Sequence, residues 1–113
     1  MLAAELIDPM LPALKPTDLV GQALVWMEEH RVGQLILTDQ GDYRGIVSEE
    51  LLMDVADDER PLRDVMSLFE QIFVNEDQHL LEVLGLAIQH QMQVIAVIGE
   101  GREFSGTISV NEL

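Results

Sequence analysis

The stretches Gly45-Ile46-Val47-Ser48 and Gly106-Thr107-Ile108-Ser109 decide the fold, because the same short turn occurs twice in the chain. In each stretch a glycine precedes two apolar or β-branched residues, which are typical of the end of a strand. A serine then stands where a helix can begin, since its hydroxyl can accept a hydrogen bond from the first helical turn. The start of a helix can also present N–H groups to a small anion. Helix capping and ligand binding are therefore both open at this point.

The sequence around the two turns repeats at a separation of 60 residues. Helical spacing of apolar residues predicts helices over 18–30 and 78–90. The apolar runs Leu35-Ile36-Leu37 and Ile95-Ala96-Val97 predict short buried strands, and each is followed by a polar hairpin signal. The residues that repeat in the helices are Val20, Ala23, Leu24 and Met27 in the first copy and Leu80, Val83, Leu84 and Ala87 in the second.

Shorter signals predict the remaining elements. Segments at 12–16 and 72–74 are expected to be extended, and Asp18 and Asp77 are candidate N-caps for the long helices. A helix over 49–57 closes the first copy, and Pro61 opens a short helix after an acidic linker. We place the two copies at 1–58 and 59–113. Because only four residues come after Ser109, we expect its helix to be truncated and to continue in a longer parent protein.

Composition excludes several classes of function. The chain has 113 residues, 48% of them hydrophobic, and no cysteine, so thiolate metal sites and cysteine nucleophiles are excluded. Its net charge of −15 argues against nucleic acid and anionic membrane surfaces, which need clustered Lys and Arg. No run of residues is apolar enough for a membrane span, and the N-terminus lacks the basic region of a signal peptide. These features predict a cytoplasmic location.

The duplicated pattern resembles a CBS domain pair, also called a Bateman module. The resemblance is carried by residues 23–27 with 45–52 and by their counterparts 83–87 with 106–113, and it covers nearly the whole chain. It also extends to small stand-alone bacterial CBS-pair proteins through residues 4–9 and 13–18. The resemblance implies an α+β fold of two βαββα repeats related by a pseudo-two-fold axis, with two clefts between them. Family members commonly bind adenosine-containing ligands there, pair as dimers through their helices, and regulate without being enzymes.

The resemblance assigns roles to several residues. The hydroxyl of each turn, Ser48 or Ser109, would contact a phosphate, and an Asp three positions later would hold the ribose. That position is Leu51 in the first copy, which departs from the pattern, and Glu112 in the second. Glu112 has an alternative role, because a Ser followed three residues later by Glu is also a capping box.

Other candidates for the ligand site are Thr17, Arg44, Ile95 and Ala96. Arg44 could reach a phosphate, although a hairpin Arg is commonly only solvated. Ile95 and Ala96 could form the wall of an adenine slot, or they could be plain core. The scarcity of cations disfavours ATP relative to AMP, adenosine or S-adenosylmethionine.

An apolar surface of Trp26, Leu51, Leu52 and Met53 is the candidate interface for a homodimer. No catalytic motif is found, and no histidine spacing indicates a metal site. We therefore expect a non-enzymatic regulatory module that senses an adenosyl ligand and requires no cofactor. The alternatives are a dimerisation module with empty clefts and, more weakly, a divalent-cation sensor based on the acidic surface.

Overall fold

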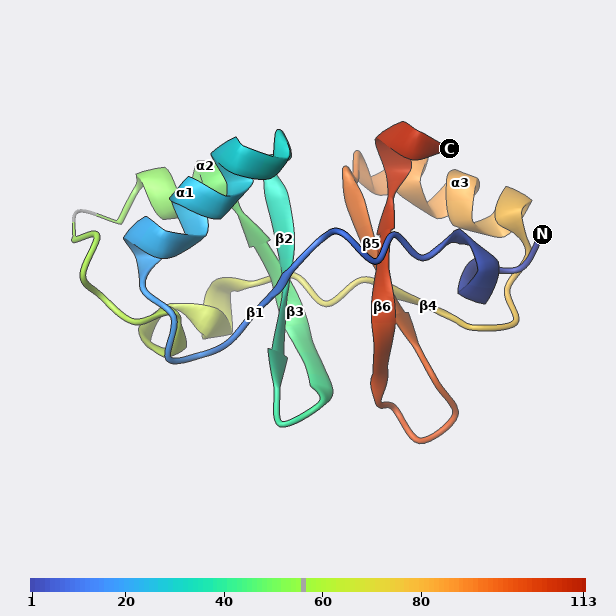
Figure 1. The fold of residues 1–113 in the computed structure, drawn as a ribbon, viewed down its shortest axis with the longest axis horizontal. Helices are drawn as coiled ribbons and strands as arrows, with labels where there is room; N and C mark the ends of the chain where they lie inside the picture. The colour runs from blue at the N-terminus through green and yellow to red at the C-terminus, as the bar shows by residue number, and fades with distance from the viewer. Residues whose placement is uncertain (56) are drawn as a thin grey trace.

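The computed structural model, which describes residues 1–55 and 57–113, contains two small sheets side by side with helices beside them (Figure 1). The first sheet has the order β1 (Ala13–Leu14), β2 (Gln34–Asp39) and β3 (Asp42–Ser48). The second has the order β4 (Phe73–Asn75), β5 (Val94–Ile98) and β6 (Phe104–Ser109). In both, the central strand is parallel to the first and antiparallel to the last. The predicted α+β duplication is confirmed.

The long helices α1 (Val20–His30) and α3 (Leu80–His90) begin two residues later than predicted and end where predicted. Each is followed by a residue in the left-handed conformation, Arg31 with φ 56° and Gln91 with φ 54°, which terminates the helix. The helix α2 (Glu49–Met53) is shorter than the predicted 49–57, of which Ala56 lies outside the described residues. Short 3-10 turns occupy Ala3–Leu6, Leu62–Asp64, Met66–Leu68 and Val110–Glu112.

The predicted caps of the long helices are wrong. The residue that precedes α1 is Leu19, whose side chain makes no cap hydrogen bond. The Asp18 carboxylate accepts the Lys15 N–H at 2.8 Å instead of an N–H group of the helix. The residue that precedes α3 is His79, not Asp77. Its Nδ1 accepts the Leu81 N–H at 3.1 Å, and the Glu82 carboxylate accepts the His79 N–H at 3.3 Å.

Two connecting segments cross from one repeat to the other. Residues 1–8 lie against the second sheet, where the Asp8 N–H donates to Thr107 O at 2.8 Å. Residues 58–70 lie against the first sheet, where the Ile46 N–H donates to Glu70 O at 2.8 Å. Ile7 therefore lies on Gly106, and Phe69 lies on Gly45. The division at residues 58 and 59 stays a prediction, since each sheet is completed by a segment from beyond it.

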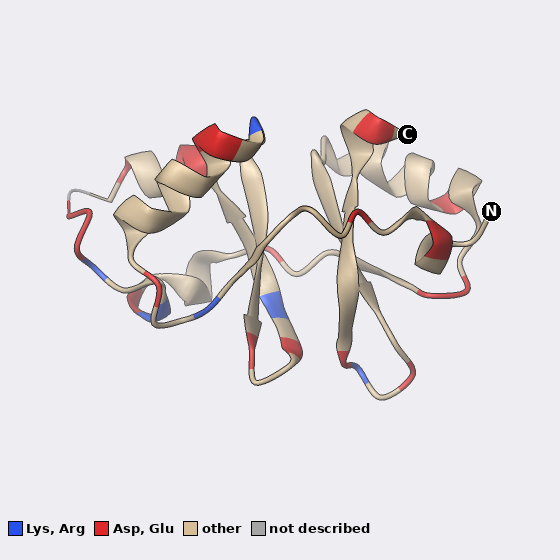
Figure 2. Cartoon of the chain, viewed as in Figure 1, with Lys and Arg blue, Asp and Glu red and all other residues tan. Residues whose placement is uncertain are grey.

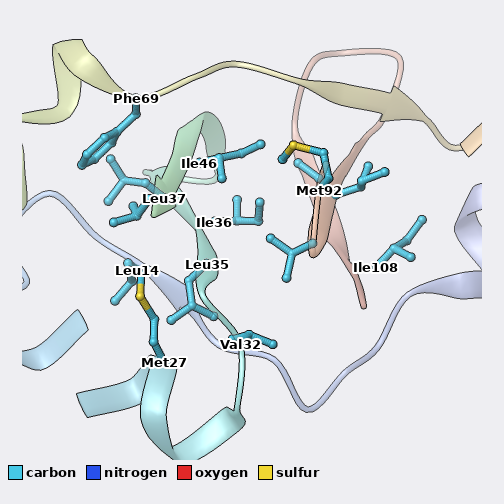
Figure 3. Close-up of a cluster of buried hydrophobic side chains, with 14 of the residues drawn as sticks. Leu14, Met27, Val32, Leu35, Ile36, Leu37, Ile46, Phe69, Met92 and Ile108 are labelled. Atoms are coloured by element: carbon cyan, nitrogen blue, oxygen red, sulfur yellow. The ribbon is translucent and has the colours of Figure 1, made fainter. Parts of the chain in front are cut away.

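The core is continuous across both repeats. β2 and β5 pack against each other between the sheets, and their residues 35–37 and 94–97 are completely buried. Figure 3 shows that Ile36 and Ile46 of the first sheet face Met92 of the second repeat. This shared core holds the ends of the strands from both repeats next to one another.

Candidate functional site

A cleft of about 280 Å³ lies where β3 meets α2, and we call it the Ser48 cleft. Both repeats and the segment that joins them contribute to its walls. Its lining residues are Gln34, Ile46, Ser48, Glu50, Leu51, Leu68, Glu70, His90 and Gln91. A wider groove of about 630 Å³ shares Gln34, Ser48, Glu50 and Gln91 with it and continues toward Gln93. The structure thus brings a predicted site residue, Ser48, to a hollow between the repeats.

Within this cleft Ser48 acts as a helix cap. Its Oγ accepts the Leu51 N–H at 3.2 Å, which satisfies one donor of the first turn of α2. One hydroxyl lone pair is left for another donor. Leu51 itself lines the cleft and presents only carbon, so it offers no acceptor for ribose hydroxyls.

The charge of the Ser48 cleft is negative. Glu50 and Glu70 line it together with His90, and no Lys or Arg is among the lining residues that the structure describes. Arg44 is exposed on β3 and is not one of those residues. Figure 2 shows how few basic residues the chain has beside its many Asp and Glu. A phosphate would meet two carboxylates here without a compensating cation.

The second turn differs from the first. Ser109 is buried, and within the described chain its side chain makes no cap hydrogen bond. The capping box expected for Ser109 and Glu112 is therefore not formed, because Val110–Glu112 is a 3-10 turn and not the start of an α-helix. Glu112 is exposed.

The remaining candidates for ligand contact lie apart from the Ser48 cleft. Thr17 lines a separate cavity of about 330 Å³ with Lys15 and the β2–β3 hairpin. Ile95 and Ala96 are 0% exposed, so they belong to the core, and the adenine-slot interpretation is wrong for them.

The predicted dimer surface is partly wrong. Leu52 is 0% exposed because it packs into the core of its own chain, and Leu51 faces the Ser48 cleft. Trp26 is half-buried, and only Met53, at 68%, is strongly exposed. A more apolar surface lies on α3, where Leu81 is 70% and Ile88 is 76% exposed. The sequence signal for this surface is the spacing i, i+4, i+7 of Leu81, Gly85 and Ile88, which lies beside the buried stripe.

Tyr43 anchors the chain that joins the repeats. Its hydroxyl donates to Ile72 O at 2.8 Å, and its ring contacts Phe73 edge-on with centroids 6.0 Å apart. Burial of the hydroxyl raises the pKa of Tyr43 well above its ordinary value. The linking segment at the edge of the cleft is thus fixed to β3.

Within the described residues, no group of three or more His, Asp or Glu side chains is placed to hold a metal ion. In that same part of the chain, no helix has the length and hydrophobicity needed to cross a membrane.

No protein-family model matches the chain, and no curated protein matches its sequence. Solved structures do match. A CBS domain pair/ACT domain protein from Thermotoga maritima has a TM-score of 0.87 at 24% identity, over 99% of this chain and 92% of that one. The CBS domains of a transcriptional regulator from Streptococcus pneumoniae have a TM-score of 0.85 at 16% identity, over 98% and 94%. A CBS domain protein from Pyrobaculum aerophilum, complexed with AMP, has a TM-score of 0.81 at 21% identity, over 100% and 90%.

These likenesses show the fold of the molecule. The chain has the fold of a CBS domain pair, as its duplicated turns predict.

Proposed function

We propose that the chain is a regulatory module, and not an enzyme, that binds a small adenosyl ligand in the Ser48 cleft. The observation that carries the proposal is that one cleft, at a strand-to-helix turn, is lined by residues of both repeats. A ligand that contacts both repeats favours the relative arrangement in which it binds more tightly. The AMP complex of a protein with the same fold supports an adenosyl ligand.

The charge of the cleft indicates which adenosyl ligands fit. Glu50 and Glu70 repel the phosphates of AMP and ATP, whereas adenosine is neutral and S-adenosylmethionine carries a net positive charge. At the position where an acceptor for the ribose hydroxyls is expected, the chain has Leu51, whose side chain cannot accept a hydrogen bond. We therefore propose that adenosine and S-adenosylmethionine bind more tightly than AMP, and AMP more tightly than ATP.

Calorimetric titration with these four compounds tests the proposal. Leu51→Asp introduces a carboxylate that can accept hydrogen bonds from the ribose hydroxyls. Such a bond contributes about 1.5–3 kcal/mol to the free energy of binding, which corresponds to at least a tenfold gain in adenosine affinity. The matched control is Val25→Asp, which adds the same carboxylate at an exposed position of α1 outside the cleft and should leave the affinity unchanged. Absence of binding by all four compounds would rule the function out. If the titration shows that a second equivalent of ligand binds, and this equivalent is lost in Glu112→Gln, then a further site lies at the Ser109 turn.

A second candidate function, homodimerisation, is favoured by the apolar face of α3. Leu81, Gly85 and Ile88 share this face, and a Cβ added at Gly85 would meet nothing within 4 Å. The chain's own packing therefore does not require glycine there, although glycine weakens a helix by about 1 kcal/mol relative to alanine. In an antiparallel two-fold pair, Leu81 meets Ile88 of the copy while the glycines allow close approach.

Charge supports a second copy as the occupant of this face. Two chains of net charge −15 repel, so they can meet only where carboxylates are few. The equivalent positions of Gly85 and Ile88 in α1 are Val25 and Glu28, which makes α1 the less suitable face.

Sedimentation velocity distinguishes the two helices. Ile88→Glu should convert a dimer into a monomer, whereas Val25→Glu, the same added charge on α1, should leave the mass unchanged. If the wild-type protein is a monomer at about 100 μM, the proposed dimer is contradicted, because stable interfaces give dissociation constants well below that concentration.

A further inference from the structure

Two glutamine side chains join the repeats beside the Ser48 cleft. Gln34 Oε1 accepts the Gln93 N–H at 2.8 Å and the Val94 N–H at 3.4 Å. In return, Gln93 Oε1 accepts the Gly33 N–H at 2.6 Å. These bonds connect the starts of β2 and β5, the two strands that pack against each other between the sheets.

Gln34 also belongs to the cleft. It is the residue opposite Ser48 in the β2–β3 pair, and it lines both the Ser48 cleft and the wider groove. Because backbone N–H groups can only donate, the atom of Gln34 that faces them must be the carboxamide oxygen. The amide NH₂ is then on the other branch of the side chain. Its two donors are not used by the bonds to Gln93 and Val94.

The second repeat does not reproduce this arrangement. The residue 60 positions after Gln34 is Val94, which has no polar side-chain group and pairs with Ser109 across β5 and β6. Likewise, Gly33 stands where the second repeat has Gln93. The two repeats therefore contribute unequally to the connection, and Gln34 is its member that lines the Ser48 cleft.

We propose that Gln34 couples occupancy of the Ser48 cleft to the contact between the repeats, an inference that rests on the proposed function. Its NH₂ donates to an acceptor atom of the bound adenosyl group, while its oxygen holds the Gln93 and Val94 amides. A ligand that fixes this side chain strengthens the contact between the repeats. By linkage, the contact strengthens ligand binding by the same factor.

Two substitutions at Gln34 separate its roles. Gln34→Glu keeps acceptor oxygens for Gln93 and Val94 but removes both donors, whereas Gln34→Leu removes donors and acceptor together. Gln22→Leu, on the exposed side of α1, is the matched control. Adenosine is the probe, because it is uncharged and responds least to the charge that Gln34→Glu adds.

The first measurement is amide hydrogen exchange of Gln93 and Val94 without ligand. We expect exchange roughly fivefold faster in Gln34→Leu, the effect of losing one net hydrogen bond. Exchange should be unchanged in Gln34→Glu and in the Gln22→Leu control. Equal exchange in wild type and Gln34→Leu would overturn the inference whatever the ligand does.

The second measurement is an NMR titration with adenosine. In wild type, the amide signals of Gln93 and Val94 should move with the same midpoint as that of Leu51, and their exchange should slow. Gln34→Glu should weaken adenosine binding roughly fivefold. If adenosine binds while Gln93 and Val94 do not respond, or if Gln34→Glu binds equally well, the coupling is wrong and the proposed function stands. If none of the four adenosyl compounds binds to wild type, the proposed function and the coupling fall together.

Discussion

Gly45 and Gly106 are glycines because another segment of the chain crosses each of them. A Cβ at Gly45 would lie 2.9 Å from Phe69 Cβ and 3.3 Å from Glu70 O. A Cβ at Gly106 would lie 2.5 Å from Ile7 Cγ2. The glycines of the repeated turns therefore accommodate the crossing segments, and the serines at the ends of these turns have separate roles.

Replacing Gly45 by alanine should destabilise the chain by about 2–4 kcal/mol, since it combines a strained backbone with overpacking. Gly45 has φ +153°, a backbone conformation that residues with a side chain rarely adopt. Gly41→Ala is the control, because Gly41 has φ +86° but open space around it. Urea unfolding should show a larger loss in Gly45→Ala than in Gly41→Ala. Equal losses would mean that Phe69 moves aside without cost.

Single residues in equivalent positions could not be told apart from the sequence. Ser48 and Ser109 occur in the same motif, yet Ser48 caps a helix and Ser109 is buried at a 3-10 turn. After Ser48 the residues Glu49–Met53 form an α-helix, whereas after Ser109 the residues Val110–Glu112 form a 3-10 turn. The prediction that Leu52 lies at an interface is wrong. The helix α2 has only five residues, and the spacing of apolar residues over so short a segment does not show which face is buried.

At the scale of elements, the strands and hairpins could be predicted because apolar runs and glycine-containing turns are local signals. The predicted helix starts differ by two residues from those observed. The prediction assigns the caps to Asp18 and Asp77 because Asp is a preferred residue at the N-cap. Asp18 instead stabilises a turn with Lys15, and His79 takes the place of Asp77 at α3. Histidine is a less common cap, so a preference for Asp could not reveal it.

The cap of α3 can be tested by a pair of substitutions. His79→Ala removes the acceptor for the Leu81 N–H and should lower stability by about 1 kcal/mol. His79→Asn keeps a side-chain acceptor at the same position and should retain most of the stability. Thermal unfolding followed by circular dichroism measures both variants. A similar loss in both would indicate that the imidazole ring acts through packing and not through its hydrogen bond.

At the scale of the whole molecule, the repeat predicted two sheets and their pseudo-symmetry but not the crossing of the connecting segments. Contacts such as Ile7 with Ile108 join residues at opposite ends of the chain. No local pattern predicts such pairs, because apolar residues in a connecting segment do not indicate which of the two sheets they cover. The Ser48 cleft was also only partly predictable, since Glu70, His90 and Gln91 come from segments far from Ser48.

The crossing segments predict how the chain behaves when it is divided. Fragment 59–113 lacks Ala3 and Asp8, whose N–H groups bond to Gln78 O and Thr107 O, both at 2.8 Å. Fragment 1–58 lacks the completely buried Leu62 and the nearly buried Phe69. We expect each fragment alone to be unfolded, because each exposes the surface that the other covers.

Mixing the two fragments should restore the fold, since together they contain every contact of the intact chain. Titration of one ¹⁵N-labelled fragment with the other should produce the dispersed amide spectrum of the intact protein at a 1:1 ratio. The control is the full-length protein cleaved after folding between residues 58 and 59, which should give the same spectrum. A dispersed native-like spectrum from either fragment alone would show that the repeats fold independently and that the crossing segments contribute little stability.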